Sequence, residues 1–235
     1  MKGKVFCIGV GPGDPEMLTL KAVRIIRECG MIALPNKDPN KSTAYNIAIQ
    51  AVPEISQKQL IGLDMPMIKD RTVLEKAHRK SADMMEKYLD AGENVAFLTL
   101  GDPTIFCTFG YINRLLQSDG YQTELVSGVP SFCAAAAKLN ISLAEWNEQL
   151  HILPALHVNS DDLSGDGNYI LMKPASRIDE VRQMLIDSGM TVCAVENCGM
   201  KDEHIYHSAE ELPNDAGYFT LIIAKNKPSF FGSTK

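Results

Sequence analysis

Two glycine- and aspartate-containing loops are the features of this chain that point most directly to a ligand. The first is Gly9-Val10-Gly11-Pro12-Gly13-Asp14-Pro15 and the second is Gly101-Asp102-Pro103. Each directly follows a short apolar run rich in β-formers, 5–10 and 95–100, so each is expected at the carboxyl end of a strand, where ligands bind in open α/β sheets. Glycines there let the backbone approach a ligand closely. We therefore expect the two loops to line one cleft.

The first loop does not have the chemistry of a nucleotide site. Its glycines follow the spacing GxGxG, whereas the dinucleotide fingerprint is GxGxxG. Asp14 would also place a carboxylate at the helix start, where a pyrophosphate needs hydrogen-bond donors. A plainer alternative is a tight strand-to-helix turn capped by Asp14 or Thr19. Capping does not require a second Gly-Asp-Pro at a second strand end, and this repetition favours a binding site.

Size and charge bound the class of protein. The chain has 235 residues, which is enough for one large or two small domains, and a formal net charge of −6 at pH 7. The charge argues against a broad nucleic-acid-binding surface. No apolar run reaches the roughly 18 residues of a membrane span, and the first residues do not have the pattern of a signal peptide. We expect a cytoplasmic protein with neither a nucleic-acid nor a membrane partner.

The six cysteines are Cys7, Cys29, Cys107, Cys133, Cys193 and Cys198. They lie mostly in apolar segments and form no CxxC pair, so we expect buried, reduced thiols rather than disulfides or a metal site.

Strands and helices alternate in the first half of the chain. Strands are expected at 5–10, 31–34, 59–63 and 95–100, and helices at 16–29, from about 42, at 72–89 and at 109–117. This alternation predicts a parallel sheet with right-handed crossovers. The pattern restarts with a strand at 122–126, so we place the boundary between an N-terminal α/β domain, 1–119, and a C-terminal α/β domain, 120–235.

The second half has a different order of elements. Helices are expected at 132–139 and 178–187, and strands at 151–154, 169–172, 192–196, 204–206 and 218–224. Because no helix separates the last strands, we expect a mixed sheet that ends in antiparallel pairs. The predicted fold class is therefore α/β, with two αβα domains.

Three segments carry a resemblance to a known family: GVGPGDPEMLTLKAVRII, TLGDPTIF and SGVPSFCAAAAKLNISLAEWNEQLHILPA. In this order they resemble the tetrapyrrole methylase superfamily over essentially the whole chain. The last segment and LPNKD are most similar to the precorrin-2 or cobalt-factor-II C-20 methyltransferases of cobalamin biosynthesis. The resemblance implies the tetrapyrrole methylase fold, S-adenosylmethionine in a cleft between the two domains, and a homodimer.

The resemblance also implies which residues contact S-adenosylmethionine: Pro12 in the first loop, Leu100, Gly101, Asp102 and Ile105 around the second, Pro130 and Ser131 in a third, and Met172 and Cys198 in the second domain. The family commonly has threonine where this chain has Pro130, so Ser131 is the preferred polar contact. This cofactor carries a sulfonium cation and no phosphate, and an acidic Gly-Asp-Pro corner is compatible with it.

The implied reaction moves a methyl group from sulfur to the C-20 meso carbon of a reduced tetrapyrrole. That carbon is already nucleophilic, so alignment of the reactants and exclusion of water are the main demands. Asp102 is the candidate catalytic proton acceptor, with orientation of its loop as the alternative role. Family members that methylate uroporphyrinogen ring carbons have a Tyr-Asp pair after the second strand. This chain has Pro35-Asn36 instead, which argues against that activity.

The implied substrate carries many carboxylates although the protein is acidic, so binding requires local cations. Lys37, Lys173 and Lys201 are the candidate substrate-binding residues. Other tetrapyrrole methylase activities, at another corrin position or in diphthine synthesis, are alternatives. A nucleotide-binding module without transfer activity is another. Ribosomal-RNA ribose methylation is disfavoured, because the net charge of −6 does not suggest a basic surface.

Overall fold

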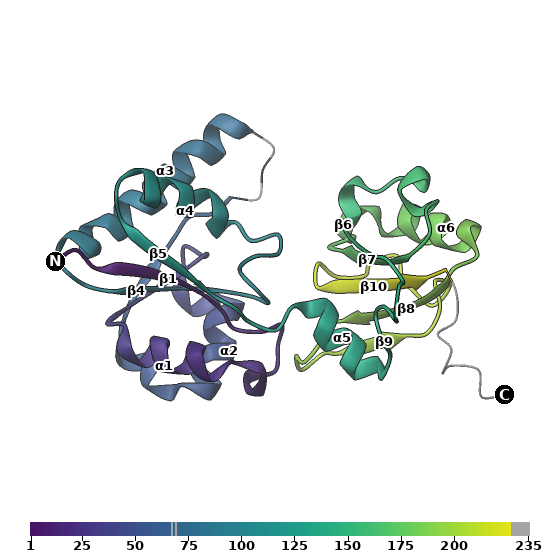
Figure 1. Ribbon diagram of the computed structural model, residues 1–235, viewed down its shortest axis with the longest axis horizontal. Helices are drawn as coiled ribbons and strands as arrows, with labels where there is room; N and C mark the ends of the chain where they lie inside the picture. Colours follow the sequence, from purple (N-terminus) through teal and green to yellow (C-terminus); the bar gives the residue numbers. More distant parts are fainter. Residues whose placement is uncertain (67, 69, 227–235) are drawn as a thin grey trace. The chain divides into compact units, whose positions relative to one another are not determined.

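The computed structural model describes residues 1–66, 68 and 70–226. Within them the chain forms two compact units, Met1–Pro130 and a second that begins at Ser131 (Figure 1). The predicted boundary after residue 119 is wrong. The strand at 122–126, placed by the sequence in the second domain, hydrogen-bonds to the first strand of the chain and completes the first sheet.

The first unit is built on a parallel sheet. Its strands are β1 (Lys4–Gly9), β2 (Met31–Leu34), β3 (Gln59–Gly62), β4 (Val95–Thr99) and β5 (Gln122–Val126), in the order β3-β2-β4-β1-β5. In the centre of the sheet, Val5 of β1 is in register with Val95 of β4 and Thr123 of β5. The central strands are apolar on both faces because helices cover both sides, as expected for a parallel sheet.

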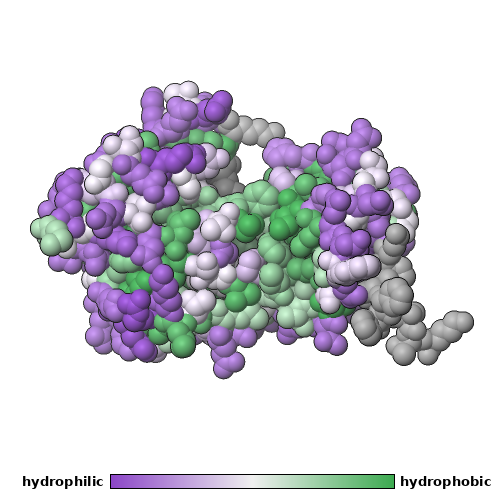
Figure 2. Space-filling model, viewed as in Figure 1, coloured by the Kyte–Doolittle hydropathy of each residue, from purple (hydrophilic) through white to green (hydrophobic). Residues whose placement is uncertain are grey.

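Helices cover the two faces of this sheet in pairs, as Figure 1 shows. Side chains of α1 (Leu20–Glu28) and α2 (Thr43–Ala51) share one core cluster with Ile8, Leu34 and Leu98. Side chains of α3 (Arg71–Asp90) and α4 (Phe109–Ser118) share another with Val5 and Phe97. The exposed residues of α3 are largely charged, and Figure 2 shows hydrophilic residues over this helix. The predicted parallel αβα architecture is confirmed.

The first helix differs from its prediction. Residues 16–29 were expected to form one helix, but Pro15–Met17 form a short 3-10 turn and α1 begins only at Leu20. Thr19 separates the two because its extended backbone places its hydroxyl to accept a hydrogen bond from the Ala22 amide at 3.1 Å. Two further 3-10 turns, Pro39–Lys41 and Pro53–Gln57, flank α2.

The second unit holds a mixed sheet. Its elements are α5 (Ser131–Leu139), β6 (Leu150–Pro154), β7 (Asn168–Met172), α6 (Ile178–Ser188), β8 (Thr191–Glu196), β9 (His204–Tyr206) and β10 (Thr220–Lys225), with 3-10 turns at Ala155–His157, Ser160–Leu163 and Ala175–Arg177. The strand order is β6-β7-β10-β8-β9. β6 and β7 are parallel, and β10 is antiparallel to both of its neighbours. This confirms the predicted mixed sheet with antiparallel pairs.

The cysteine prediction is only partly right. No disulfide joins any of the six cysteines, all of which lie in the described residues. Cys7, Cys29 and Cys198 are buried, but Cys107 and Cys193 are half-buried and Cys133 is exposed. Cys133 lies in an alanine-rich helix, where apolar composition alone does not show which side of the helix faces the core. None of the helices in the described part of the chain combines the length and the apolar character needed to cross a membrane.

Candidate functional site

The two loops singled out in the sequence follow adjacent strands whose connections leave the first sheet toward opposite faces. β1 leads to α1 on one face, and β4, its neighbour, leads to α4 on the other. Such a position is a topological switch point, where open α/β sheets bind their ligands beyond the carboxyl ends of the strands. The sheet order therefore places the Gly9–Pro15 loop and the Gly101-Asp102-Pro103 loop at the ligand-binding position of this fold.

Backbone hydrogen bonds join the two loops. The Gly101 amide donates to the Gly11 carbonyl at 2.9 Å and the Gly11 amide donates to the Gly101 carbonyl at 3.4 Å. Gly11 has φ +76° and Gly101 has φ +64°, in the left-handed region that glycine adopts without strain. The prediction that the two loops lie together is confirmed. The same hydrogen bonds place Pro12, which follows Gly11 and is buried, close to Gly101 and to the preceding residue, Leu100.

A third loop, residues 127–130 after β5, packs against the same point through glycine. A Cβ added to Gly9 would lie 2.4 Å from the Gly101 carbonyl oxygen, and one added to Gly128 would lie 2.3 Å from the same oxygen. These contacts are between backbones, so a side chain cannot be accommodated by a change of rotamer. Gly9, Gly101 and Gly128 form what we call the glycine junction of the three loops.

Asp102 fixes the junction from the side. Its carboxylate accepts hydrogen bonds from the Thr104 amide at 2.8 Å and from the Gly128 amide at 3.0 Å, and its residue is only 8% exposed. Burial alone would raise the pKa of Asp102, but hydrogen bonds from Thr104, Gly128 and Ser127 outweigh burial and the pKa is lowered. Asp102 is therefore ionised, with both carboxylate oxygens engaged in holding loops. This geometry fits the loop-orienting role, and the proton-acceptor role stays a prediction.

The predicted residues of the second unit lie beyond the carboxyl ends of β7 and β8, which are both antiparallel to β10. Met172 ends β7, and Cys198, which is 7% exposed, follows β8 on the other side of β10. Lys173 has φ +59°, and its Nζ lies 5.6 Å from the centroid of the Tyr218 ring. Lys201 is exposed in the turn after β8 and makes no ion pair with the described residues. This edge thus gathers Met172, Lys173, Cys198 and Lys201.

The remaining predicted residues are Ile105, Pro130, Ser131 and Lys37. Ile105 is half-buried and follows the second loop, where its amide donates to the Asp102 carbonyl at 3.3 Å. Pro130 is the last residue of the first unit and Ser131 the first residue of α5. Lys37 lies apart from the glycine junction, beyond the end of β2, and forms an ion pair with Asp64 at 3.0 Å.

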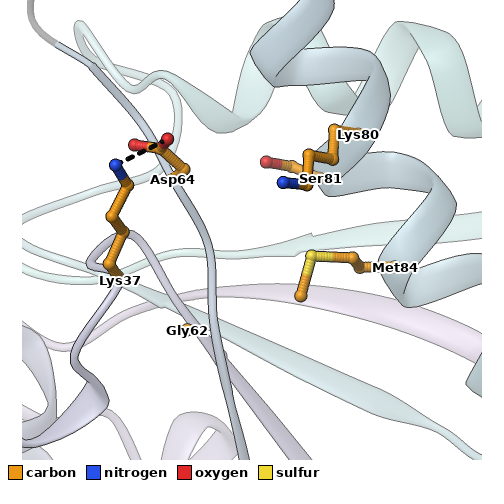
Figure 3. Close-up of a pocket in the computed structure, with 6 residues that line it drawn as sticks. All are labelled: Lys37, Gly62, Asp64, Lys80, Ser81 and Met84. Carbon is orange, nitrogen blue, oxygen red and sulfur yellow. Dashed lines mark ion pairs between the residues drawn. The ribbon is translucent and has the colours of Figure 1, made fainter.

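Lys37 belongs to a pocket of about 360 Å³ that sequence reasoning missed (Figure 3). The residues that line it are Lys37, Gly62, Asp64, Lys80, Ser81 and Met84. Asp64 follows a strand end, a position that could have marked it, but Lys80, Ser81 and Met84 are in the middle of a long polar helix. The sequence there shows only helical periodicity, so no local signal identifies the pocket.

The family of the chain follows from comparison with known proteins. Residues 4–213 match the family model of the Tetrapyrrole (Corrin/Porphyrin) Methylases. The chain belongs to this family. The chain is 41% identical to the probable cobalt-precorrin-2 C(20)-methyltransferase of Methanocaldococcus jannaschii. This match spans 152 residues and covers 64% of each chain. The chain is 27% identical to the cobalt-precorrin-2 C(20)-methyltransferase of Salmonella typhimurium, over 97% of this chain and 98% of the relative.

Solved structures of tetrapyrrole methylases share the fold. The uroporphyrin-III C-methyltransferase of Thermus thermophilus, crystallised with S-adenosylhomocysteine, has a TM-score of 0.69 to this chain. The match covers 95% of this chain and 98% of that chain at 20% sequence identity. The fold predicted from the three sequence segments is thereby confirmed.

The first loop of this tetrapyrrole methylase fits a cofactor without phosphate. The Asp14 carboxylate accepts a hydrogen bond from the Glu16 amide at 2.8 Å, and Thr19 caps α1. Side chains therefore already occupy both helix starts after β1, where a nucleotide-binding fold would offer free amides to a phosphate. Asp14 also adds a negative charge, which suits a cationic ligand rather than a pyrophosphate. The sequence suggested Asp14 or Thr19 as a helix cap, and the structure has both.

Proposed function

We propose that this chain is an S-adenosylmethionine-dependent methyltransferase that methylates C-20 of precorrin-2 or of its cobalt-containing counterpart, cobalt-factor II, in cobalamin biosynthesis. The observation that carries the proposal is its 41% identity to a relative described as a C(20)-methyltransferase. The nearly full-length match to a second C(20)-methyltransferase supports it.

Cofactor binding is assigned first to the glycine junction and its loops. S-adenosylmethionine, when bound, supplies an electrophilic methyl group on a sulfonium sulfur. The proposed contacts are Pro12, Leu100, Gly101, Asp102, Ile105, Pro130, Ser131, Met172 and Cys198. The capped helix starts at Asp14 and Thr19 support a ligand that carries positive charge and no phosphate, and they disfavour the alternative of a nucleotide-binding module.

The protein's part in the reaction is positioning. Asp102 holds the loops after β4 and β5 in a single arrangement, so the backbone that faces the cofactor does not have to reorganise when the substrate arrives. The target carbon is nucleophilic by conjugation and needs a proton acceptor only after attack. We retain Asp102 as the candidate acceptor, with its two engaged oxygens arguing for a positioning role.

Substrate binding is assigned to lysines, because the tetrapyrrole bears many carboxylates. Lys37, Lys173 and Lys201 are the proposed contacts, and each lies beyond the carboxyl end of a strand. We further propose that the enzyme works in the cytoplasm as a homodimer, on the grounds of its family. Sedimentation of the purified protein checks the dimer.

The activity is tested by incubating the purified protein with isotopically labelled S-adenosylmethionine and either metal-free or cobalt-containing substrate. We expect the pigment to gain one labelled methyl group, located at C-20 by NMR, and the preferred substrate reveals whether cobalt is present. No transfer to either pigment, or transfer to another ring position, would overturn the proposal. Calorimetry with S-adenosylhomocysteine, NAD and ATP should show binding of the first alone.

A further inference from the structure

The pocket beside Lys37 has the groups of an anion-binding site. Figure 3 shows Lys37 and Asp64 on one side of it, from the loops after β2 and β3, and Lys80, Ser81 and Met84 on the other, from α3. Lys37 and Lys80 are exposed, so their ammonium groups are available to a ligand that arrives from solvent. Ser81 is 2% exposed and belongs to α3, so its backbone position is fixed. Its hydroxyl can donate a hydrogen bond to a ligand in the pocket.

The charges of the lining residues leave an excess of one positive charge. Lys37 and Lys80 contribute two ammonium groups, and Asp64 neutralises one of them through its 3.0 Å ion pair with Lys37. A single carboxylate would balance the remaining charge. A dianion such as phosphate would leave the pocket with a net negative charge, and a cation would be repelled by the two lysines. Lysines with a hydroxyl also match a carboxylate, because ammonium and hydroxyl groups are both donors.

The walls of the pocket suit a carboxylate that is carried on a short alkyl arm. Met84 offers a polarisable apolar surface to methylene groups. Gly62 shapes the opposite wall: a Cβ there would lie 2.3 Å from the Lys37 carbonyl oxygen, so only glycine lets the loop that bears Lys37 lie over the end of β3. The backbone is thus arranged to hold Lys37 in this position.

The pocket lies at a useful distance from the glycine junction. In the sheet order β3-β2-β4-β1, β3 is two strands from β4 and three from β1. Neighbouring strands are about 4.8 Å apart, so the ends of these strands are separated by roughly 10 to 14 Å. A macrocycle whose reacting carbon lies at the switch point can extend a peripheral acetate or propionate arm over this distance.

We propose that Lys37, Lys80 and Ser81 form a subsite that binds one peripheral carboxylate arm of the tetrapyrrole, with the Asp64 carboxylate offsetting part of its positive charge. The subsite rests on the proposed function and deepens it. It adds Lys80, Ser81 and Asp64 to the residues that select the substrate, and it gives Lys37 a defined partner group. None of these residues takes part in cofactor binding.

The test compares single-charge variants of the pocket. Lys80→Gln removes one donor and should raise the KM for the tetrapyrrole about tenfold, the effect of one charge-assisted hydrogen bond. Asp64→Asn should do the opposite, with KM about fivefold lower at low salt, because it removes a negative charge beside the bound carboxylate. The affinity for S-adenosylhomocysteine should not change in either variant.

Lys87→Gln is the matched control. Lys87 is exposed on the same helix, but it lies toward the start of β4 and does not line the pocket. If Lys80→Gln behaves like Lys87→Gln, or if Asp64→Asn leaves the KM unchanged, the subsite is rejected. A purely structural ion pair would lower thermal stability in Asp64→Asn without lowering the KM.

A binding assay separates failure of the subsite from failure of the proposed function. Uroporphyrin III is a stable tetrapyrrole with carboxylate arms, and its absorbance reports binding without methyl transfer. Binding that weakens in Lys80→Gln and strengthens in Asp64→Asn supports the subsite even if no methyl transfer is found. Methyl transfer by the parent protein, with uroporphyrin binding equal in all four proteins, overturns the subsite and leaves the proposed function standing.

Discussion

The Asp102 carboxylate accepts a hydrogen bond from the backbone amide of Gly128 at 3.0 Å, and this contact joins the loop after β4 to the loop after β5. The same carboxylate binds the Thr104 amide within its own loop. Because the Gly101 backbone is in turn bonded to Gly11, one buried side chain fixes the geometry of all three loops at the switch point. The stability of these loops and their ability to bind a ligand should therefore depend on the same residue.

Asp102→Asn is expected to loosen the junction. The amide group retains one acceptor oxygen and turns a donor toward an N–H that needs an acceptor, so the variant should lose about 1.5 to 3 kcal/mol of unfolding free energy. Hydrogen exchange of the Gly128 amide should become faster, and S-adenosylhomocysteine should bind more weakly. Asp14→Asn is the control, because asparagine caps a helix as well as aspartate does. A fall in kcat alone, with stability and affinity intact, would instead identify Asp102 as the proton acceptor.

The lowered pKa of Asp102 predicts how this contribution depends on pH. A carboxylate whose pKa is lower in the folded state than in the unfolded state stabilises the protein above its unfolded-state pKa, near the ordinary value of 3.8. The contribution is lost as the pH falls through the lowered value. The difference in melting temperature between the parent protein and Asp102→Asn should thus be constant from pH 7 to about pH 5 and shrink below about pH 4. A difference that grows on acidification would contradict this sign.

Gly128→Ala should separate the three loops. Its Cβ would lie 2.3 Å from the Gly101 carbonyl oxygen and 2.7 Å from the Gly9 carbonyl carbon, and neither backbone atom can move independently. We expect a loss of about 2 to 4 kcal/mol and a large loss of S-adenosylhomocysteine affinity. Gly110→Ala is the control, because its Cβ in α4 would meet no described atom within 4 Å. Alanine there should be neutral or stabilise the protein by up to about 1 kcal/mol. Equal melting temperatures for the two variants would contradict the junction.

The sequence was sufficient to predict the positions of the strands and of the loops that follow them. Apolar runs end at glycine, aspartate and proline in the first sheet, and each of these signals is local. The domain boundary was missed for the opposite reason. The strand β5 follows the turn Ser118-Asp119-Gly120, which we interpreted as the break between two domains. In the structure β5 pairs with β1, and the paired residues are more than a hundred positions apart in the sequence. Local pattern contains no information on such a pairing.

The residues of the candidate site also differ in how well the sequence alone predicts them. The Asp102 and Gly101 positions were visible in the sequence because their types and spacing are unusual. The contact of Gly128 with Gly9 was not visible, since a glycine's requirement for space depends on what packs against it. The pocket was missed because Lys80 and Ser81 come from α3 while Asp64 comes from a strand end. Helical periodicity identifies α3 but does not show what faces its middle.

Lys173 provides a final test of substrate binding, in the second unit. Its backbone is held at φ +59°, a conformation that costs a non-glycine residue about 1 to 3 kcal/mol, and its Nζ lies 5.6 Å from the centroid of the Tyr218 ring. Strain retained at a charged residue is consistent with a role for the side chain. We expect Lys173→Ala to raise the KM for the tetrapyrrole about tenfold and to leave the affinity for S-adenosylhomocysteine unchanged.

Two further substitutions separate the charge of Lys173 from its backbone. Lys173→Arg keeps the charge and should recover most of the substrate affinity. Lys173→Gly relieves the strain, so it should melt at a higher temperature than Lys173→Ala while binding the substrate equally poorly. Steady-state kinetics and calorimetry with S-adenosylhomocysteine measure both effects in each variant. Equal losses of cofactor and substrate affinity in Lys173→Ala would show that the residue supports the fold of this edge rather than binding a carboxylate.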